Sequence, residues 1–111
     1  MKKLFIAAFI FVSTFTTNTF AEVKMGIILG FTGPIESLTP AMAASAELAF
    51  KEASDSGSLL GGEKISVIRA DSTCVDSAAA TAAAEGVISQ GVAAIMGADC
   101  SGVTGAIASN V

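Results

Sequence analysis

The 111-residue chain has no histidine, tryptophan or tyrosine, and only six lysine and arginine residues against ten aspartate and glutamate residues. Without histidine, it lacks the usual base of nucleophilic enzymes and a common nitrogen ligand of zinc. With so few basic residues, it offers no positive patch to nucleic acid or to an anionic membrane surface. We therefore expect no enzyme activity, no catalytic residue, no metal, no other cofactor and no nucleic-acid partner.

Two further kinds of site are missing their usual parts. Gly30 and Gly33 follow an apolar segment, but they belong to no G-x-G-x-x-G sequence, and no Gly-Lys-Ser/Thr sequence is present. Cys100 lies between a predicted strand and a predicted helix, as an elbow nucleophile does, yet Ala98 stands where such an elbow has glycine. The sequence thus indicates neither a phosphate-binding loop nor thiol catalysis.

Residues 1–21 are typical of a secretory signal peptide. Lys2 and Lys3 precede a short apolar core at 4–12, and Thr19-Phe20-Ala21 supplies small residues before the predicted cut. A membrane anchor is the alternative, but the apolar core is too short to span a bilayer and serine and threonine residues follow it. We predict cleavage after Ala21, which leaves residues 22–111 with four basic and ten acidic side chains and a formal charge of −6.

Three apolar segments alternate with three helical segments in this mature region. We predict strands at 23–29, 65–68 and 92–96, and helices at 39–53, at 78–90 and from residue 101 onwards. Helical connections of this length require parallel strands. The predicted fold class is therefore α/β, a three-layer βαβαβα parallel sheet in one modest domain.

Local patterns also predict how the helices begin and pack. Thr39 should cap the first helix, with Pro40 in its first turn. Asp76 or Ser77 should cap the second helix, and Asp99 or Ser101 should cap the third. Glu47 and Lys51 are spaced as an i,i+4 ion pair. The predicted buried faces consist of Met42, Ala46, Ala49, Phe50 and Ala53 in the first helix, and Ala80, Ala84, Val87 and Ile88 in the second.

The three loops that follow the strands should meet at one edge of the sheet, where open parallel sheets bind ligands. These loops cover residues 30–38, 70–76 and 97–101. Cys74 and Cys100 lie in two of them, so a disulfide is expected in an exported protein, with two buried free thiols as the alternative. Ser101, beside the free amides of a helix N-terminus, suits the capture of a carboxylate or another anion, unless it only caps the helix.

Four segments carry a resemblance to a known family. Phe31-Thr32-Gly33-Pro34 follows the first strand, Leu60-Gly61-Gly62-Glu63-Lys64-Ile65 leads into the second, Asp71-Ser72-Thr73-Cys74 follows it, and Gly97-Ala98-Asp99-Cys100-Ser101 follows the third. With this ordered set and its cysteine pair, the mature region resembles the N-terminal part of the leucine/isoleucine/valine-binding proteins, the type I periplasmic binding proteins of ABC transporters.

The resemblance implies a periplasmic protein with two lobes, which closes on a free amino acid or a similar small solute and delivers it to a membrane permease. Ser101 matches the serine that binds the ligand's α-carboxylate, and Cys74 and Cys100 match a disulfide pair. Leu38 falls where members often carry an aromatic residue against the ligand side chain, so the ligand's identity stays open.

Two alternatives accompany this interpretation. The same fold serves as a ligand-sensing receptor domain that regulates a partner, and the chain could also be an inactive fragment. Because the resemblance places the α-amino contacts and the second lobe beyond Val111, we expect residues 22–111 alone to bind no amino acid measurably.

Overall fold

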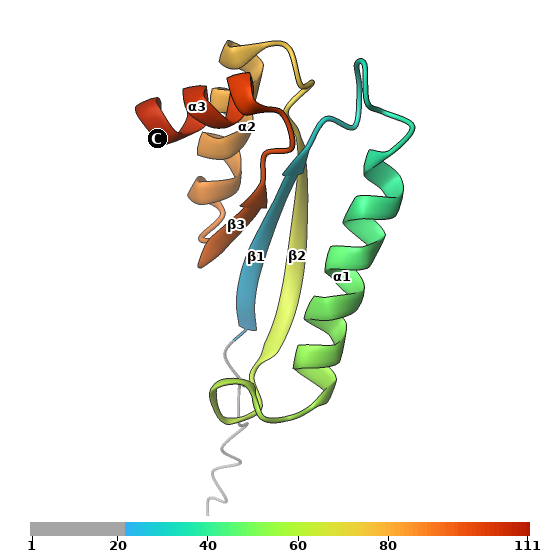
Figure 1. The fold of residues 1–111 in the computed structure, drawn as a ribbon. Coiled ribbons are helices and arrows are strands. Elements are labelled where there is room, and N and C mark those ends of the chain that lie inside the picture. The colour runs from blue at the N-terminus through green and yellow to red at the C-terminus, as the bar shows by residue number, and fades with distance from the viewer. Residues whose placement is uncertain (1–21) are drawn as a thin grey trace, which may run out of the picture.

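The structure, a computed structural model, describes residues 22–111. The predicted signal peptide lies outside the described residues. Three strands and three α-helices alternate along the chain, with one short 3-10 turn (Figure 1). The elements are β1 (Glu22–Leu29), α1 (Thr39–Asp55), the 3-10 turn Leu59–Gly61, β2 (Lys64–Asp71), α2 (Ser77–Ser89), β3 (Ala94–Gly97) and α3 (Ser101–Asn110).

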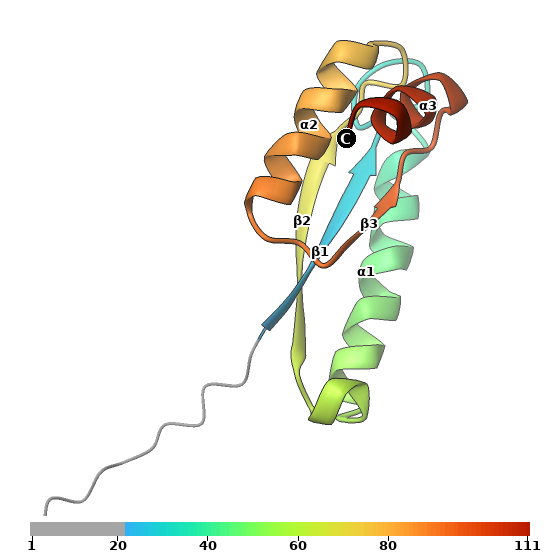
Figure 2. The same cartoon turned by 90° about the vertical axis from the view of Figure 1, so that its left-hand side faces the viewer.

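The strands form one parallel sheet in the order β2-β1-β3, so the first strand of the chain lies at the centre. In the register, Met25 of β1 pairs with Val67 of β2 and with Ala94 of β3. Helix α1 covers one face of the sheet, and α2 and α3 lie on the other (Figures 1 and 2). The predicted three-layer α/β fold with a parallel sheet is confirmed.

The central strand supplies the core because its side chains alternate between the two faces of the sheet. Ile27 and Leu29 pack towards α1, where Ala43 meets them. Ile28 packs towards α2, where it meets Ala84 and Val87. All are essentially inaccessible to solvent, and each large side chain stabilises the fold by about 1.5–3 kcal/mol.

The strand limits differ from those predicted because pairing with β1 sets them. Strand β2 extends over Lys64–Asp71, since every residue of β1 from Glu22 to Leu29 has a partner in it. Strand β3 begins at Ala94, two residues later than predicted, where its register with β1 starts. The hydrophobic pattern of the sequence predicted where both strands lie, but hydrogen bonding to β1 sets where each strand begins and ends.

The buried faces of the first two helices were predicted only in part. In α1, Ala43 is fully buried, whereas Met42 and Ala49 are exposed. In α2, Ala80, Ala84 and Val87 are buried as predicted, but Ile88 is 46% exposed. The buried face of each helix is narrower than its apolar pattern indicated, because only one row of side chains along the helix faces the sheet.

The predicted ion pair between Glu47 and Lys51 is wrong. Arg69 of β2 donates two hydrogen bonds to Glu47, at 2.6 Å from Nε and 2.8 Å from the guanidinium NH2 group. Lys51 instead pairs with Asp55, one turn further along α1. The planar fork of arginine binds both oxygens of one carboxylate, which a lysine on the same helix cannot do.

The predicted cap of α1 is also wrong, whereas one for α2 is confirmed. Leu38 is the N-cap residue of α1, and the buried Thr39 donates its hydroxyl to the carbonyl oxygens of Gly30 at 3.1 Å and Glu36 at 3.3 Å. At α2, the Asp76 carboxylate accepts hydrogen bonds from the amides of the second and third helical residues, at 2.9 and 3.0 Å. Thr39 fails as a cap because its hydroxyl donates to carbonyl oxygens of the loop 30–38 instead.

Candidate functional site

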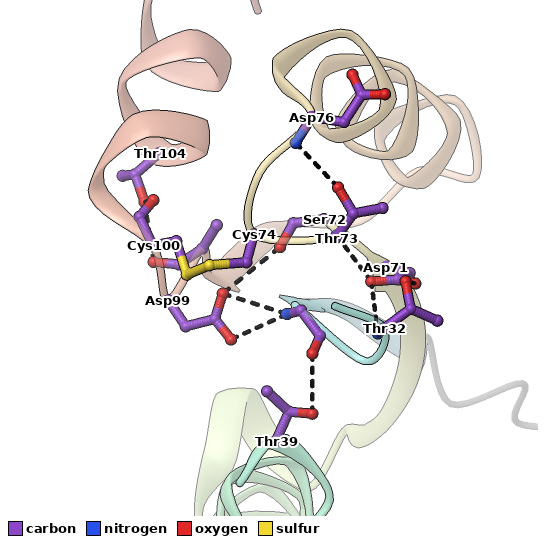
Figure 3. Close-up of a disulfide and its surroundings, with 12 residues drawn as sticks. Thr32, Thr39, Asp71, Ser72, Thr73, Cys74, Asp76, Asp99, Cys100 and Thr104 are labelled. Atoms are coloured by element: carbon purple, nitrogen blue, oxygen red, sulfur yellow. Dashed lines mark hydrogen bonds between the residues drawn. A yellow bond between two sulfur atoms is a disulfide. The ribbon is translucent and has the colours of Figure 1, made fainter. Parts of the chain in front are cut away.

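The carboxyl ends of the three strands carry the loops 30–38, 72–76 and 98–100 to one edge of the sheet (Figure 3). Cys74 and Cys100 form a disulfide between two of these loops, with their Cα atoms 5.2 Å apart. The predicted disulfide is thereby confirmed, and the free-thiol alternative is wrong. The edge that sequence analysis singled out is thus covalently joined at one point.

Asp99 does not cap α3, contrary to one of the two predictions for that helix. Both oxygens of its half-buried carboxylate accept hydrogen bonds from the backbone amide of Gly30, at 3.2 and 2.9 Å. The hydroxyl of the buried Ser72 donates to Oδ1 at 3.5 Å. The carboxylate is therefore directed to the loops after β1 and β2, and it leaves the first turn of α3 free.

Asp71, the last residue of β2, holds the same two loops from the other side. Its carboxylate accepts the Thr32 hydroxyl at 2.6 Å, the Thr32 amide at 3.3 Å and the Thr73 amide at 2.8 Å. Partial burial of the Asp71 carboxyl opposes its ionisation, but these hydrogen bonds prevail and hold its pKa below the ordinary value. Asp71 is therefore charged and fully engaged at neutral pH.

Helix α3 begins at Ser101 without a capping side chain from any residue of 22–111. Cys100 is the N-cap residue, with extended backbone angles (φ −114°, ψ 128°), so the predicted cap role of Ser101 is wrong. Ser101 and Gly102 are exposed, and a Cβ built on Gly102 would meet no atom within 4 Å. Ser101 and Gly102 therefore border open space, and the first amides of α3 donate to no capping side chain among the described residues, an arrangement that suits an anion.

Leu38 stands at the start of α1, and its side chain is 60% exposed. The structure thus brings the two predicted ligand contacts, Leu38 and Ser101, to helix starts at the same end of the sheet (Figure 1). Leu38 offers apolar surface, while Ser101 offers a hydroxyl beside helix amides.

Sequence reasoning missed the polar residues that connect the loops. Ser72 and Thr39 are fully buried; Ser72 hydrogen-bonds to Asp99 in the loop after β3, and Thr39 hydrogen-bonds to Gly30 at the far end of the loop 30–38. The available signal was the row of serine, threonine and aspartate residues immediately after the strands. Such side chains satisfy loop amides and carbonyls that would otherwise be buried without partners.

Across residues 22–111, no three histidine, cysteine, aspartate or glutamate side chains gather closely enough to hold a metal ion. Over that range the helices are also too short or too polar to cross a membrane.

The model of one protein family, described as "Periplasmic binding protein", matches residues 22–111. No curated protein matches the chain. The matched residues include all three loops of the candidate site.

Proposed function

Because the chain belongs to the periplasmic binding protein family, whose members bind small solutes in the periplasm or outside the cell, we propose that it captures a free amino acid and serves an ABC transporter. Branched-chain amino acids or similar solutes are the proposed ligands, and the transporter's membrane permease is the proposed partner. Export through a signal peptide at residues 1–21 belongs to the same proposal. So does the assignment of residues 22–111 as one part of a two-lobed ligand-binding protein.

The observation that carries the proposal is the uncapped start of α3. Its first amides and the exposed Ser101 have no capping side chain among residues 22–111, and the neighbouring Asp99 is hydrogen-bonded to Gly30 instead. A ligand carboxylate placed there would gain hydrogen bonds from amides and hydroxyl together with the positive end of the helix dipole. Leu38 would contact the ligand's side chain.

The acidic character of the surroundings favours an amino acid over a more negative solute. Asp71 and Asp99 border the same loops, and the basic residue nearest in sequence to them, Arg69, is paired with Glu47. A phosphate or dicarboxylate would place additional negative charge beside these carboxylates. A zwitterion brings one carboxylate and its own positive charge.

Isothermal titration calorimetry of the full-length exported gene product tests the binding step. We expect one of L-leucine, L-alanine or L-phenylalanine to bind, and the amide of that amino acid, which lacks the carboxylate, not to bind. Ser101→Ala should lower the affinity about tenfold, because a hydrogen bond to a charged group contributes roughly 1.5–3 kcal/mol.

Ser45→Ala is the matched control, since Ser45 is an exposed serine of α1 whose hydroxyl bonds only within its own helix. Equal affinity of the Ser101→Ala and Ser45→Ala proteins would contradict the assignment of Ser101. Absence of binding by the whole panel would contradict the amino-acid class.

The transport step has its own test. We expect deletion of the gene to reduce uptake of the bound amino acid by intact cells, and the wild-type gene to restore it. Binding without any change in uptake would contradict the transport role and favour a receptor that reports the solute to a partner.

A further inference from the structure

Asp99 joins the loop after β3 to the loop after β1 (Figure 3). Its two carboxylate oxygens accept the Gly30 amide at 3.2 and 2.9 Å, across 69 positions of sequence. A hydrogen bond to a charged acceptor is about twice as strong as one between neutral groups. The contact therefore fixes Gly30 relative to the residues that begin α3.

Gly30 is held at its carbonyl as well as at its amide. The buried Thr39 hydroxyl donates to the Gly30 oxygen at 3.1 Å, and Thr39 is the first residue of α1. Leu38 directly precedes Thr39. A continuous path of two hydrogen bonds thus leads from Asp99 through Gly30 to the start of α1.

Close packing around Gly30 also restricts the movement of the loop 30–38. Gly30 is buried, and a Cβ built on it would lie 3.1 Å from the Cβ of Cys74 and 3.3 Å from Cγ1 of Ile35. The disulfide therefore covers Gly30 on one side, while Asp99 and Thr39 hold its polar groups. Of the two hydrogen bonds, only the one to Asp99 leads to α3, where Cys100 of the disulfide also lies.

We propose that Asp99 is a positioning residue of the ligand site, which sets the distance between the apolar contact at Leu38 and the anion-binding start of α3. This inference rests on the proposed function. Asp99 itself touches no ligand in this role. Because the two ends of an amino acid would contact the two helix starts, the distance between them determines which side chain fits, so Asp99 controls selectivity as well as affinity.

The role requires an acceptor at this position, not a negative charge. An asparagine oxygen can accept the Gly30 amide, while it removes a charge that repels a ligand carboxylate bound nearby. Asp99→Asn should therefore keep the selectivity of the wild type without weakening binding. Asp99→Ala removes the acceptor and should lose the selectivity.

Calorimetry on the full-length exported protein, with L-alanine, L-leucine and L-phenylalanine as probes, tests the inference. The readout is the ratio between the affinities of the best-bound and the worst-bound probe. In Asp99→Ala we expect this ratio to fall about tenfold towards one, in line with the loss of a charge-assisted hydrogen bond. Asp99→Asn should retain the wild-type ratio.

Asp76→Ala is the matched control, because Asp76 is a carboxylate of the same edge that caps α2 and makes no hydrogen bond to the loop 30–38. It should lower stability without changing the ratio. If Asp99→Ala does not fold, Thr39→Val cuts the next hydrogen bond of the same path and should reduce the ratio likewise.

The outcomes separate this inference from the proposed function. A wild-type protein that discriminates between the probes, together with an unchanged ratio in Asp99→Ala or Thr39→Val, would overturn the role of Asp99 alone. A wild-type protein that binds no probe would overturn the proposed function, and the positioning role would fall with it.

Discussion

Arg69 of β2 binds both carboxylate oxygens of Glu47 on α1, so that this ion pair connects the helix to the edge strand beneath it. Both side chains remain partly exposed, at 44% for Arg69 and 35% for Glu47. The guanidinium also lies over the Phe31 ring, 5.6 Å from its centroid. Arg69 thus contacts α1 and the loop after β1 at the same time.

Replacing Glu47 with glutamine should lower the melting temperature by a few degrees at neutral pH, as is usual for an exposed pair. The hydrogen bonds from Arg69 hold the pKa of Glu47 below its ordinary 4.5, against the opposing effect of burial. The pair therefore stabilises the protein fully above about pH 4.5, and the contribution is lost as the pH falls through the lowered pKa.

Thermal unfolding of wild type and Glu47→Gln from pH 7 down to pH 3 measures this effect, with Glu52→Gln as the control for an exposed glutamate of the same helix. The difference between wild type and Glu47→Gln should narrow at acid pH. A difference that widened as the pH fell would contradict the assignment.

Asp76→Ala should reduce the free energy of unfolding by about 1 kcal/mol, because α2 loses the acceptor for two of its first amides. Urea denaturation followed by circular dichroism measures the loss. Glu85→Ala, an exposed change within the same helix, is the control. Equal stability of the two variants would show that the cap contributes nothing.

Replacing both cysteines with serine should destabilise the protein by about 3 kcal/mol, since the disulfide closes a loop between positions 26 apart. Reductant should lower the stability of the wild type to that of this double variant, and it should leave the stability of the variant unchanged. In the intact mass of the exported protein, we expect a chain that begins at Glu22 and two thiols that alkylate only after reduction. Thiols that react without reductant would contradict the disulfide.

Two glycine-to-alanine changes should act in opposite directions. A Cβ at Gly26, within β1, would lie 2.6 Å from Cγ1 of Val87, so Gly26→Ala should cost about 1–3 kcal/mol through overpacking. A Cβ at Gly86, within α2, would meet no atom within 4 Å, so Gly86→Ala should stabilise the helix by up to about 1 kcal/mol. Urea denaturation of the Gly26→Ala and Gly86→Ala variants measures both changes in stability and tests whether α2 lies against β1 as described.

Residues 22–111 produced alone should give no heat of binding with L-leucine. The resemblance places half of the ligand contacts on a second lobe, and an open site that leaves most of the ligand in water binds weakly. Circular dichroism and the intact disulfide would show that the material is folded. Micromolar binding by these residues would contradict the two-lobed interpretation.

The sequence predicted those features that depend on local composition. Apolar runs of strand length, separated by helical segments, specified the α/β order and the edge at which the loops meet. Cys74 and Cys100 fell in two of those loops, so their disulfide followed from the topology as well as from the family resemblance. Each of these predictions needs only the chain order and the direction of the strands.

Features decided by competition between distant partners were not predictable. Asp99 has the right chemistry and position for a helix cap, but the Gly30 amide, distant in sequence, takes its carboxylate. Glu47 has a lysine one turn away, but Arg69 offers both of its hydrogen bonds. In each case the local candidate is reasonable, and the tertiary partner provides better geometry.

The central place of β1 has a consequence for how the chain folds. Strand β1 is synthesised before both of its neighbours, which come from residues 64–71 and 94–97. One edge of β1 therefore stays unpaired until nearly all of the described chain has been made. Parallel sheets with such distant partners form slowly and expose aggregation-prone strands meanwhile. A chaperone that binds the segment 22–29 during export would shield the residues that later become the centre of the core.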